Sequence, residues 1–202
     1  MMTLKSRRQR CQRCLRPDTH CLCSLIPSLP SRTRVLVLQH PDETQHALNT
    51  ARFVALGLQN SQWVVAEVVD DLEQYVQQPG YRACLLFPGE QAQELVAYQA
   101  QEQPLLLVVP DGTWRKARKI LHSNPVLATL PRVTLPAGLK SRYRLRKAPT
   151  AEALATVEAV YYALDILEPE LDFSALLQPF EALIEGQIQA MGAAVYQRHH
   201  LD

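Results

Sequence analysis

Five short apolar runs recur between residues 34 and 135, and segments with helical spacing lie between them. The runs are RVLVLQ (34–39), WVVAEVV (63–69), ACLLF (83–87), PLLLVV (104–109) and RVTL (132–135). Strands that are buried on both faces read as continuous apolar runs, and strands that alternate with helices typically form a parallel sheet. The pattern therefore predicts an α/β fold with a mostly parallel sheet flanked by helices.

The helical spacing predicts five helices. Three lie between the apolar runs, over 44–56, 91–101 and 113–121. Two longer ones close the chain, over 151–167 and 173–191, where apolar residues recur every three or four positions. Pro169 ends the first of these, and Pro179 predicts a kink in the second.

A cysteine-rich segment precedes the first apolar run. Its C-x2-C-x6-C-x-C pattern consists of Cys11, Cys14, Cys21 and Cys23. Four close thiols in a reducing cytosol suit a closed, structural, tetrahedral Zn²⁺ site, and His20 in place of one thiolate is an alternative. We expect a Cys-rich zinc-binding arm over residues 1–30 and an α/β domain over 31–202, although a reduced, metal-free tail is also compatible with the pattern. The fifth cysteine, Cys84, stands inside ACLLF and is expected to be a buried small hydrophobe.

The formal net charge of +1 conceals a strong division of charge along the chain. Residues 1–40 hold eight basic residues against Asp18 alone, and residues 111–149 hold ten against Asp111 alone. Lys and Arg neutralise phosphates and release counterions, so two separate basic blocks favour a nucleic-acid partner. Solvated faces of helices and loops are the alternative interpretation.

The sequence gives no indication of a membrane partner. No stretch approaches the roughly 20 apolar residues that span a bilayer. The Arg-rich start MMTLKSRRQRCQRC lacks the apolar segment of a secretory signal. We therefore expect a cytoplasmic protein.

Polar and turn-forming residues follow three of the apolar runs. They are Gln39-His40-Pro41, Pro88-Gly89-Glu90 and Pro110-Asp111-Gly112-Thr113-Trp114. Ligand sites of open α/β sheets form beyond the carboxyl ends of the strands, so these turns are expected to border the site. The chain has neither GxGxxG nor GxxxxGK[ST], which leaves no support for a Rossmann dinucleotide site or a P-loop.

The turn PDGTW allows a structural and a functional interpretation. Asp111 can cap the following helix by accepting the N–H of Thr113 or Trp114, with Trp114, Ala117 and Leu121 as its buried stripe. Alternatively, Asp111 is a reactive carboxylate beside a basic surface that holds RNA, with Tyr143 available to stack on a base. The residues expected to bind RNA are Arg115, Lys116, Arg118, Lys119, Lys140, Arg142 and Arg144.

Several motifs, in order, cover nearly the whole chain: CxxC…CLC, QHPDE followed by NTAR, LLFPGE, PDGTW, and LRKAP followed by LATVEA. Together they resemble the DTW-domain family of tRNA-uridine aminocarboxypropyltransferases. The resemblance implies transfer of the 3-amino-3-carboxypropyl group of S-adenosylmethionine to N3 of a uridine in tRNA, which forms acp3U and releases methylthioadenosine. It also implies a SPOUT-like fold with a C-terminal trefoil knot. The alternatives are a SPOUT-type RNA methyltransferase that uses the same co-substrate, and a non-catalytic zinc-ribbon RNA-binding protein.

This chemistry assigns expected roles to individual residues. Uridine N3 carries a proton that a general base must remove; Asp111 is the candidate, and His40 is a rival. Trp114 is expected to lie against the sulfonium or to shape the pocket. Asn49 and Arg52 either face the cleft or lie on the surface. The residues expected to bind S-adenosylmethionine are Phe87, Pro88, Gly89, Thr113, Trp114, Leu145, Arg146, Lys147, Ala148, Thr156 and Glu158. For Thr156 and Glu158, holding the LRKAP loop or lying on an exposed helix face are the alternatives.

Overall fold

A six-stranded, wholly parallel sheet forms the centre of the molecule in the computed structural model, which describes residues 9–99, 101–145, 153–192 and 195–197. Its strands are β1 (Arg34–Gln39), β2 (Ser61–Val65), β3 (Arg82–Leu86), β4 (Gln93–Glu94), β5 (Leu105–Asp111) and β6 (Arg132–Thr134), in the order β2-β1-β5-β3-β6-β4. The prediction of an α/β fold with a parallel sheet is confirmed.

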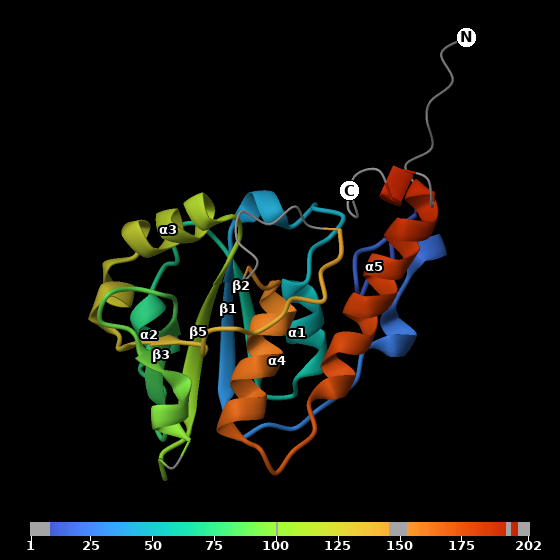
Figure 1. Ribbon diagram of the computed structural model, residues 1–202. Helices are drawn as coiled ribbons and strands as arrows, with labels where there is room; N and C mark the ends of the chain where they lie inside the picture. Colours follow the sequence, from blue (N-terminus) through green and yellow to red (C-terminus); the bar gives the residue numbers. More distant parts are fainter. Residues whose placement is uncertain (1–8, 100, 146–152, 193–194, 198–202) are drawn as a thin grey trace.

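Helices cover both faces of this sheet (Figure 1). On one face lie α1 (Ala51–Gly57) and α4 (Thr156–Leu167), with α5 (Gln178–Met191) outside them. On the other lie α2 (Leu72–Val76) and α3 (Trp114–Ser123). None of the helices in the described part of the chain has the length and apolar character needed to span a membrane.

Alternation along the central strands divides the core into two clusters. In β1, Val35 and Val37 belong to the cluster under α1 and α4, whereas Leu36 and Leu38 belong to the cluster under α2 and α3. Successive side chains of a strand point to opposite faces, so a strand covered on both sides needs apolar residues at every position. This is why the buried strands were recognisable in the sequence. Cys84 is fully buried in the same sheet, as expected.

Two predicted helices differ from the structure. Within the segment expected to be a helix over 91–101, the structure has the short strand β4 and a 3-10 turn, Leu95–Tyr98, and this one turn is enough to bury Leu95 and Tyr98. The helix expected from residue 44 begins only at Ala51. Before it, the Asn49 side chain donates to the carbonyl of Glu43, a side-chain contact that competes with helical hydrogen bonding.

Two further expectations are corrected. Pro179 does not kink α5, because it lies in the first turn, where its missing N–H leaves no hydrogen bond unmade. The strand expected over 63–69 ends at Val65, and the N–H of Val69 instead donates to Asn124 Oδ1 at 2.8 Å. The five-residue helix α2 follows this segment and was not expected.

A buried carboxylate fastens the end of α4 to the start of the central strand. Glu168 is 1% exposed, and its two oxygens accept the backbone N–H groups of Arg32 at 2.7 Å and Thr33 at 2.8 Å. Hydrogen bonds to a charged acceptor are stronger than those between neutral groups. The bonds hold the C-terminal layer against the strand that leads into the site.

We expect Glu168→Ala to lower the free energy of unfolding by about 2 kcal/mol, because it leaves two N–H groups without their acceptor. Urea denaturation followed by circular dichroism measures this change. Glu170→Ala, at an exposed position two residues later, is the matched control and should change stability by less than about 0.5 kcal/mol. Equal effects of the two substitutions would contradict the proposed fastening.

Candidate active site and cysteine cluster

A cleft of about 1020 Å³ opens at the carboxyl ends of the strands. Its walls come from the end of β5, the start of α3, the segment after β6 and the start of α4. Apolar and aromatic side chains make up much of the lining, which includes Val109, Trp114, Val133, Leu135, Tyr143 and Leu145. The position agrees with the general rule for open α/β sheets.

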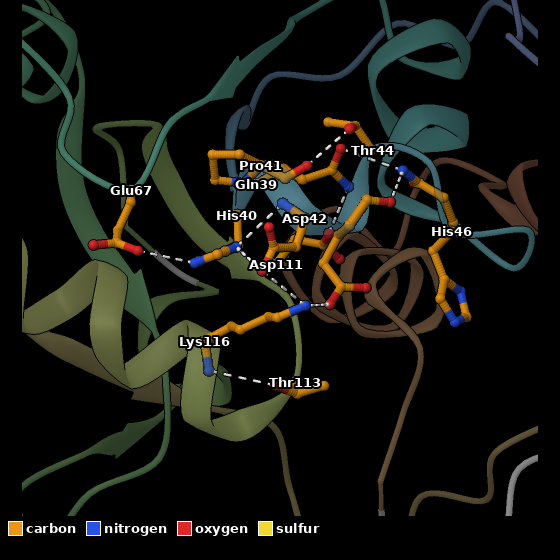
Figure 2. A network of polar contacts seen from close by, with 12 residues as sticks. Gln39, His40, Pro41, Asp42, Thr44, His46, Glu67, Asp111, Thr113 and Lys116 are labelled. Atoms are coloured by element: carbon orange, nitrogen blue, oxygen red, sulfur yellow. Dashed lines mark hydrogen bonds and ion pairs between the residues drawn. The ribbon is translucent and has the colours of Figure 1, made fainter.

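Asp111, the last residue of β5, lies in this cleft with 8% of its surface exposed. Its Oδ2 accepts the Gln39 amide at 2.6 Å, and its Oδ1 accepts the hydroxyl of Thr156 at the start of α4. Gln39 is itself fully buried, and its Oε1 accepts the Asn49 amide at 3.2 Å. Figure 2 shows Gln39 and Asp111 within this network. The carboxylate is thus held from both β1 and α4.

Burial raises the pKa of Asp111 above its ordinary value, and the nearby charge of Glu43 raises it further. The hydrogen bonds from Gln39 and Thr156 act in the opposite direction, since they stabilise the charged form. The carboxyl group is therefore a stronger base than an exposed aspartate.

The helix cap is a different residue from the one expected. Thr113 is the N-cap of α3, and its hydroxyl accepts the Lys116 N–H at 3.4 Å. The side chain of Asp111 is therefore free of the capping role. The expected buried stripe is also wrong for Trp114, which is 42% exposed; Ala117 and Ile120 are the buried residues of α3.

Trp114 instead forms part of the cleft. Its ring meets Phe87 edge to face, with centroids 5.6 Å apart, and both residues line the cleft. Trp114 is exposed and Phe87 is half-buried, and large aromatic side chains are normally buried, so the exposed Trp114 ring at the cleft is available to a ligand.

Most of the residues expected to bind S-adenosylmethionine line the cleft, and two do not. Phe87, Pro88, Thr113, Trp114, Leu145 and Thr156 are lining residues. Arg146, Lys147 and Ala148 lie outside the described residues. Gly89 packs against the Arg132 side chain, away from the lining.

Glu158 is the second exception. It is 1% exposed, and its carboxylate accepts the Ser141 hydroxyl and the backbone N–H groups of Arg142 and Ala155 at 2.5 to 2.8 Å. These bonds join the loop around residue 141 to the start of α4. The contacts match the alternative role of holding the loop.

The rival base, His40, has partners at both ring nitrogens. Nδ1 accepts the N–H of Asp42 at 3.3 Å, and Nε2 lies 3.0 Å from Glu67 Oε2 (Figure 2). His40 is 6% exposed and does not line the cleft. Its geometry fits a residue that positions the loop after β1.

Sequence reasoning assigned no role to Gln39 or Glu43, and both belong to the site. Gln39 holds the Asp111 carboxylate. Glu43 lines the cleft and pairs with Lys116 at 2.8 Å, and this carboxylate raises the pKa of the lysine. Both residues stand in the motif QHPDE, which marked the segment without identifying their partners.

The residues expected to bind RNA divide into two groups. Four pair with carboxylates: Lys116 with Glu43, Lys119 with Glu67, Arg142 with Glu181 and Arg144 with Glu185. Arg115, Arg118 and Lys140 are exposed and make no ion pair with the described residues. Much of the second basic block therefore neutralises the protein's own acidic groups.

The four cysteines of the N-terminal segment come together as expected. Their sulfur atoms all lie within 4.8 Å of one another, with Cys11 3.5 Å from Cys23 and Cys14 3.8 Å from Cys21. Backbone N–H groups of Cys14 and Arg13 lower the pKa of the Cys11 thiol to about 6. His20 is not a member of this group of sulfur atoms, and its Nδ1 lies 2.8 Å from the Thr19 hydroxyl.

The Cys-rich segment is fastened to the body by two arginines. Arg16 donates to the carbonyl of Ala47 at 2.8 Å, and Arg52 of α1 donates to the carbonyl of Arg13 at 2.7 Å. Ile26, at the end of the segment, is buried in the core beneath α1 and α4. Of the two residues expected near the cleft, Asn49 lines it and Arg52 does not.

Comparison with known proteins gives consistent matches. The family model of the DTW domain matches residues 8–188. A protein named tRNA-uridine aminocarboxypropyltransferase 2 from Drosophila melanogaster is 33% identical over 204 residues, covering 95% of this chain and 80% of that protein. Its namesake from Macaca fascicularis is 30% identical, covering 96% and 69%. The tRNA-uridine aminocarboxypropyltransferase A of Arabidopsis thaliana is 28% identical, covering 81% and 74%. On this match over most of its length, the chain belongs to the DTW domain family.

Proposed function

We propose that the protein transfers the 3-amino-3-carboxypropyl group of S-adenosylmethionine to N3 of a uridine in tRNA, forming acp3U and releasing methylthioadenosine. The observation that carries the proposal is the buried carboxylate of Asp111, held on both oxygens in a large cleft. The names of the relatives agree with it, since each is called a tRNA-uridine aminocarboxypropyltransferase.

The cleft suits a positively charged nucleoside. Its volume is at the upper end of the roughly 300–1,000 Å³ of small-molecule sites. Three carboxylates, Glu43, Glu94 and Asp111, line it against the single lysine Lys116 among the described residues. S-adenosylmethionine would supply a cationic sulfonium and the electrophilic carbon next to it. Trp114, Phe87 and the apolar wall would hold it, because aromatic faces attract cations.

Asp111 acts as the general base. Each carboxylate oxygen has two acceptor sites, and Gln39 and Thr156 occupy one on each, so room remains for the N3 proton. Gln39 and Thr156 keep the carboxylate fixed while that proton is transferred. The proton moves to Asp111 as N3 forms its new bond to carbon and the carbon–sulfur bond breaks.

We further propose that Cys11, Cys14, Cys21 and Cys23 bind a structural zinc ion. A tetrahedral site with Zn–S bonds of about 2.3 Å places its sulfur atoms about 3.8 Å apart. The two measured sulfur–sulfur distances, 3.5 and 3.8 Å, are close to this value. On this proposal residues 1–30 are a zinc-binding arm and residues 31–202 the catalytic domain. Zinc would fix the turn in which Leu15 adopts a positive φ of 57°.

The SPOUT-like class and its C-terminal knot remain part of the proposal. The parallel sheet and the cleft between its strand ends and α4 are compatible with that class. The segment before α4 includes residues 146–152, which lie outside the described part of the chain.

Mass spectrometry of nucleosides tests the reaction. We expect unmodified tRNA incubated with the protein and S-adenosylmethionine to yield acp3U, with methylthioadenosine in equal amount. Methyluridine without acp3U would establish the methyltransferase alternative. RNA binding without either product, and without thermal stabilisation by S-adenosylmethionine, would establish the non-catalytic alternative.

We expect Asp111→Asn to lower kcat/KM by about 10²- to 10⁴-fold, because the amide cannot accept the N3 proton. The same substitution should leave the melting temperature at pH 7 equal to or above that of the wild type. Burial raises the pKa of Asp111 in the folded protein, so as pH rises the carboxyl group of the unfolded chain loses its proton first. The free energy of unfolding therefore falls as pH rises from about 3.8, the ordinary pKa, through the raised pKa of the folded protein. The asparagine side chain does not ionise, so Asp111→Asn removes this loss of stability.

Transferase assays and thermal melts across pH measure both effects. Asp70→Asn, at an exposed position before α2, is the control and should change neither. A fully active Asp111→Asn protein would exclude the carboxylate as base. Inactivity together with global unfolding would show that Asp111 serves the fold.

We expect the purified protein to contain about one zinc ion per chain, and Cys14→Ser to lose most of it, because a tetrahedral site needs all four thiolates. Atomic absorption measures the zinc content. Cys84→Ala is the matched control, since that cysteine is buried in β3 away from the cluster and should retain zinc. Equal zinc content in Cys14→Ser and the wild type would contradict this assignment.

A further inference from the structure

A second, smaller pocket of about 280 Å³ lies between the Cys-rich segment and the body. Its arginine and histidine lining comes from both sides: Arg10, Arg16 and His20 from the Cys-rich segment, and His46 and Arg52 from the body. No aspartate or glutamate is among the described residues that line it. The pocket therefore presents positive charge and hydrogen-bond donors without an internal counter-charge from a carboxylate.

Among the described residues, the side-chain hydrogen bonds of the three pocket arginines go to backbone carbonyls, and Arg52 also stacks on the Trp63 ring, 4.7 Å from its centroid. Arg10 donates to the carbonyl of Leu15 at 3.1 Å, and Arg16 to the carbonyls of His20 and Ala47. Arg52 donates to the carbonyl of Arg13. Within the described ranges, none of the three pairs with a carboxylate.

The basic residues of α3 and of the loop after β6 have the opposite arrangement. There, Lys116, Lys119, Arg142 and Arg144 pair with carboxylates. Arg16 and Arg52, in contrast, are partly buried without such a partner. The thiolates of the Cys-rich segment lie close enough to act on both arginines, but no carboxylate among the described lining residues does, so guanidinium donors remain for an external anion.

The pocket borders the Asp111 cleft. His46 and Asn49 line both cavities, so an extended ligand can occupy the two at once. His46 Nδ1 accepts the N–H of Leu48 at 3.3 Å, which leaves the proton of the neutral ring on Nε2 as a donor. In Figure 2 the His46 ring points away from the network around Asp111.

We propose that this pocket binds a backbone phosphate of the RNA strand whose uridine enters the Asp111 cleft. The inference rests on the proposed function and extends it, because it makes the Cys-rich segment part of the substrate-binding surface. The three guanidinium groups supply positive charge, and they and the two imidazoles offer hydrogen-bond donors to phosphate oxygens. The uridine base is bound by the cleft, and the adjoining strand is oriented by the pocket.

Arg10→Gln is the most informative substitution. Among the described residues, the Arg10 side chain bonds within the Cys-rich segment, so its loss leaves the two fastening bonds of Arg16 and Arg52 in place. The matched control is Arg82→Gln, because Arg82 is exposed at the opposite end of the sheet, at the start of β3. Arg16→Gln provides a second variant inside the pocket.

The experiment measures the Kd for an unmodified tRNA transcript over a series of KCl concentrations, together with KM, kcat and zinc content. We expect Arg10→Gln to raise Kd and KM about tenfold and to reduce the slope of log Kd against log salt by about 1. Its kcat and zinc content should stay within about twofold of the wild type. Arg82→Gln should match the wild type in every measurement.

Each possible result of these measurements either supports or overturns the proposed phosphate pocket. Unchanged affinity and salt slope in both pocket variants would overturn it while leaving the transferase function intact. Loss of zinc in Arg16→Gln with normal RNA binding in Arg10→Gln would also overturn it, by showing that the arginines serve the thiolates. Weaker RNA binding in Arg10→Gln by a protein that forms no acp3U would support the pocket and refute the proposed function.

Discussion

The hydrogen bond between Gln39 and Asp111 depends on the register of two neighbouring parallel strands. β1 and β5 are paired so that Gln39 lies opposite Asp111 at their carboxyl ends. Both side chains therefore reach the same edge of the sheet, where the buried amide meets the buried carboxylate. A shift of one residue would turn one of them to the other face of the sheet. The strand register thus fixes the position of the Asp111 carboxylate.

The sequence was sufficient to predict the sheet, because β1 and β5 are covered on both faces and need apolar residues throughout. It was less informative for the short elements. Residues 91–101 bury only Leu95 and Tyr98 strongly, and a 3-10 turn satisfies that spacing as well as an α-helix. The late start of α1 depends on the tertiary contacts of Asn49, which no local pattern displays.

The site could be predicted in part for the same reason. The position of Asp111 beyond an apolar run located it at the end of a strand. The role of Gln39 depends on strand register, and the pairing of Arg142 and Arg144 depends on α5, which follows about 40 residues later. A count of basic residues therefore overestimated the charge available to RNA on that surface. The pocket beside the Cys-rich segment was not evident, because its arginines come from both sides of the junction with the body.

If the cleft binds a uridine and the smaller pocket a phosphate, as proposed, the wall shared by the two cavities would let the protein distinguish a uridine within a polymer from a free nucleoside. Asn49 lines both cavities and donates to Gln39, the residue that holds the Asp111 carboxylate. A free nucleoside can fill the cleft but has no flanking phosphate to place beside His46. A polynucleotide would engage both sides of the wall. Ligand length would then be read at Asn49, which lies next to Gln39, the residue that holds the Asp111 carboxylate in place.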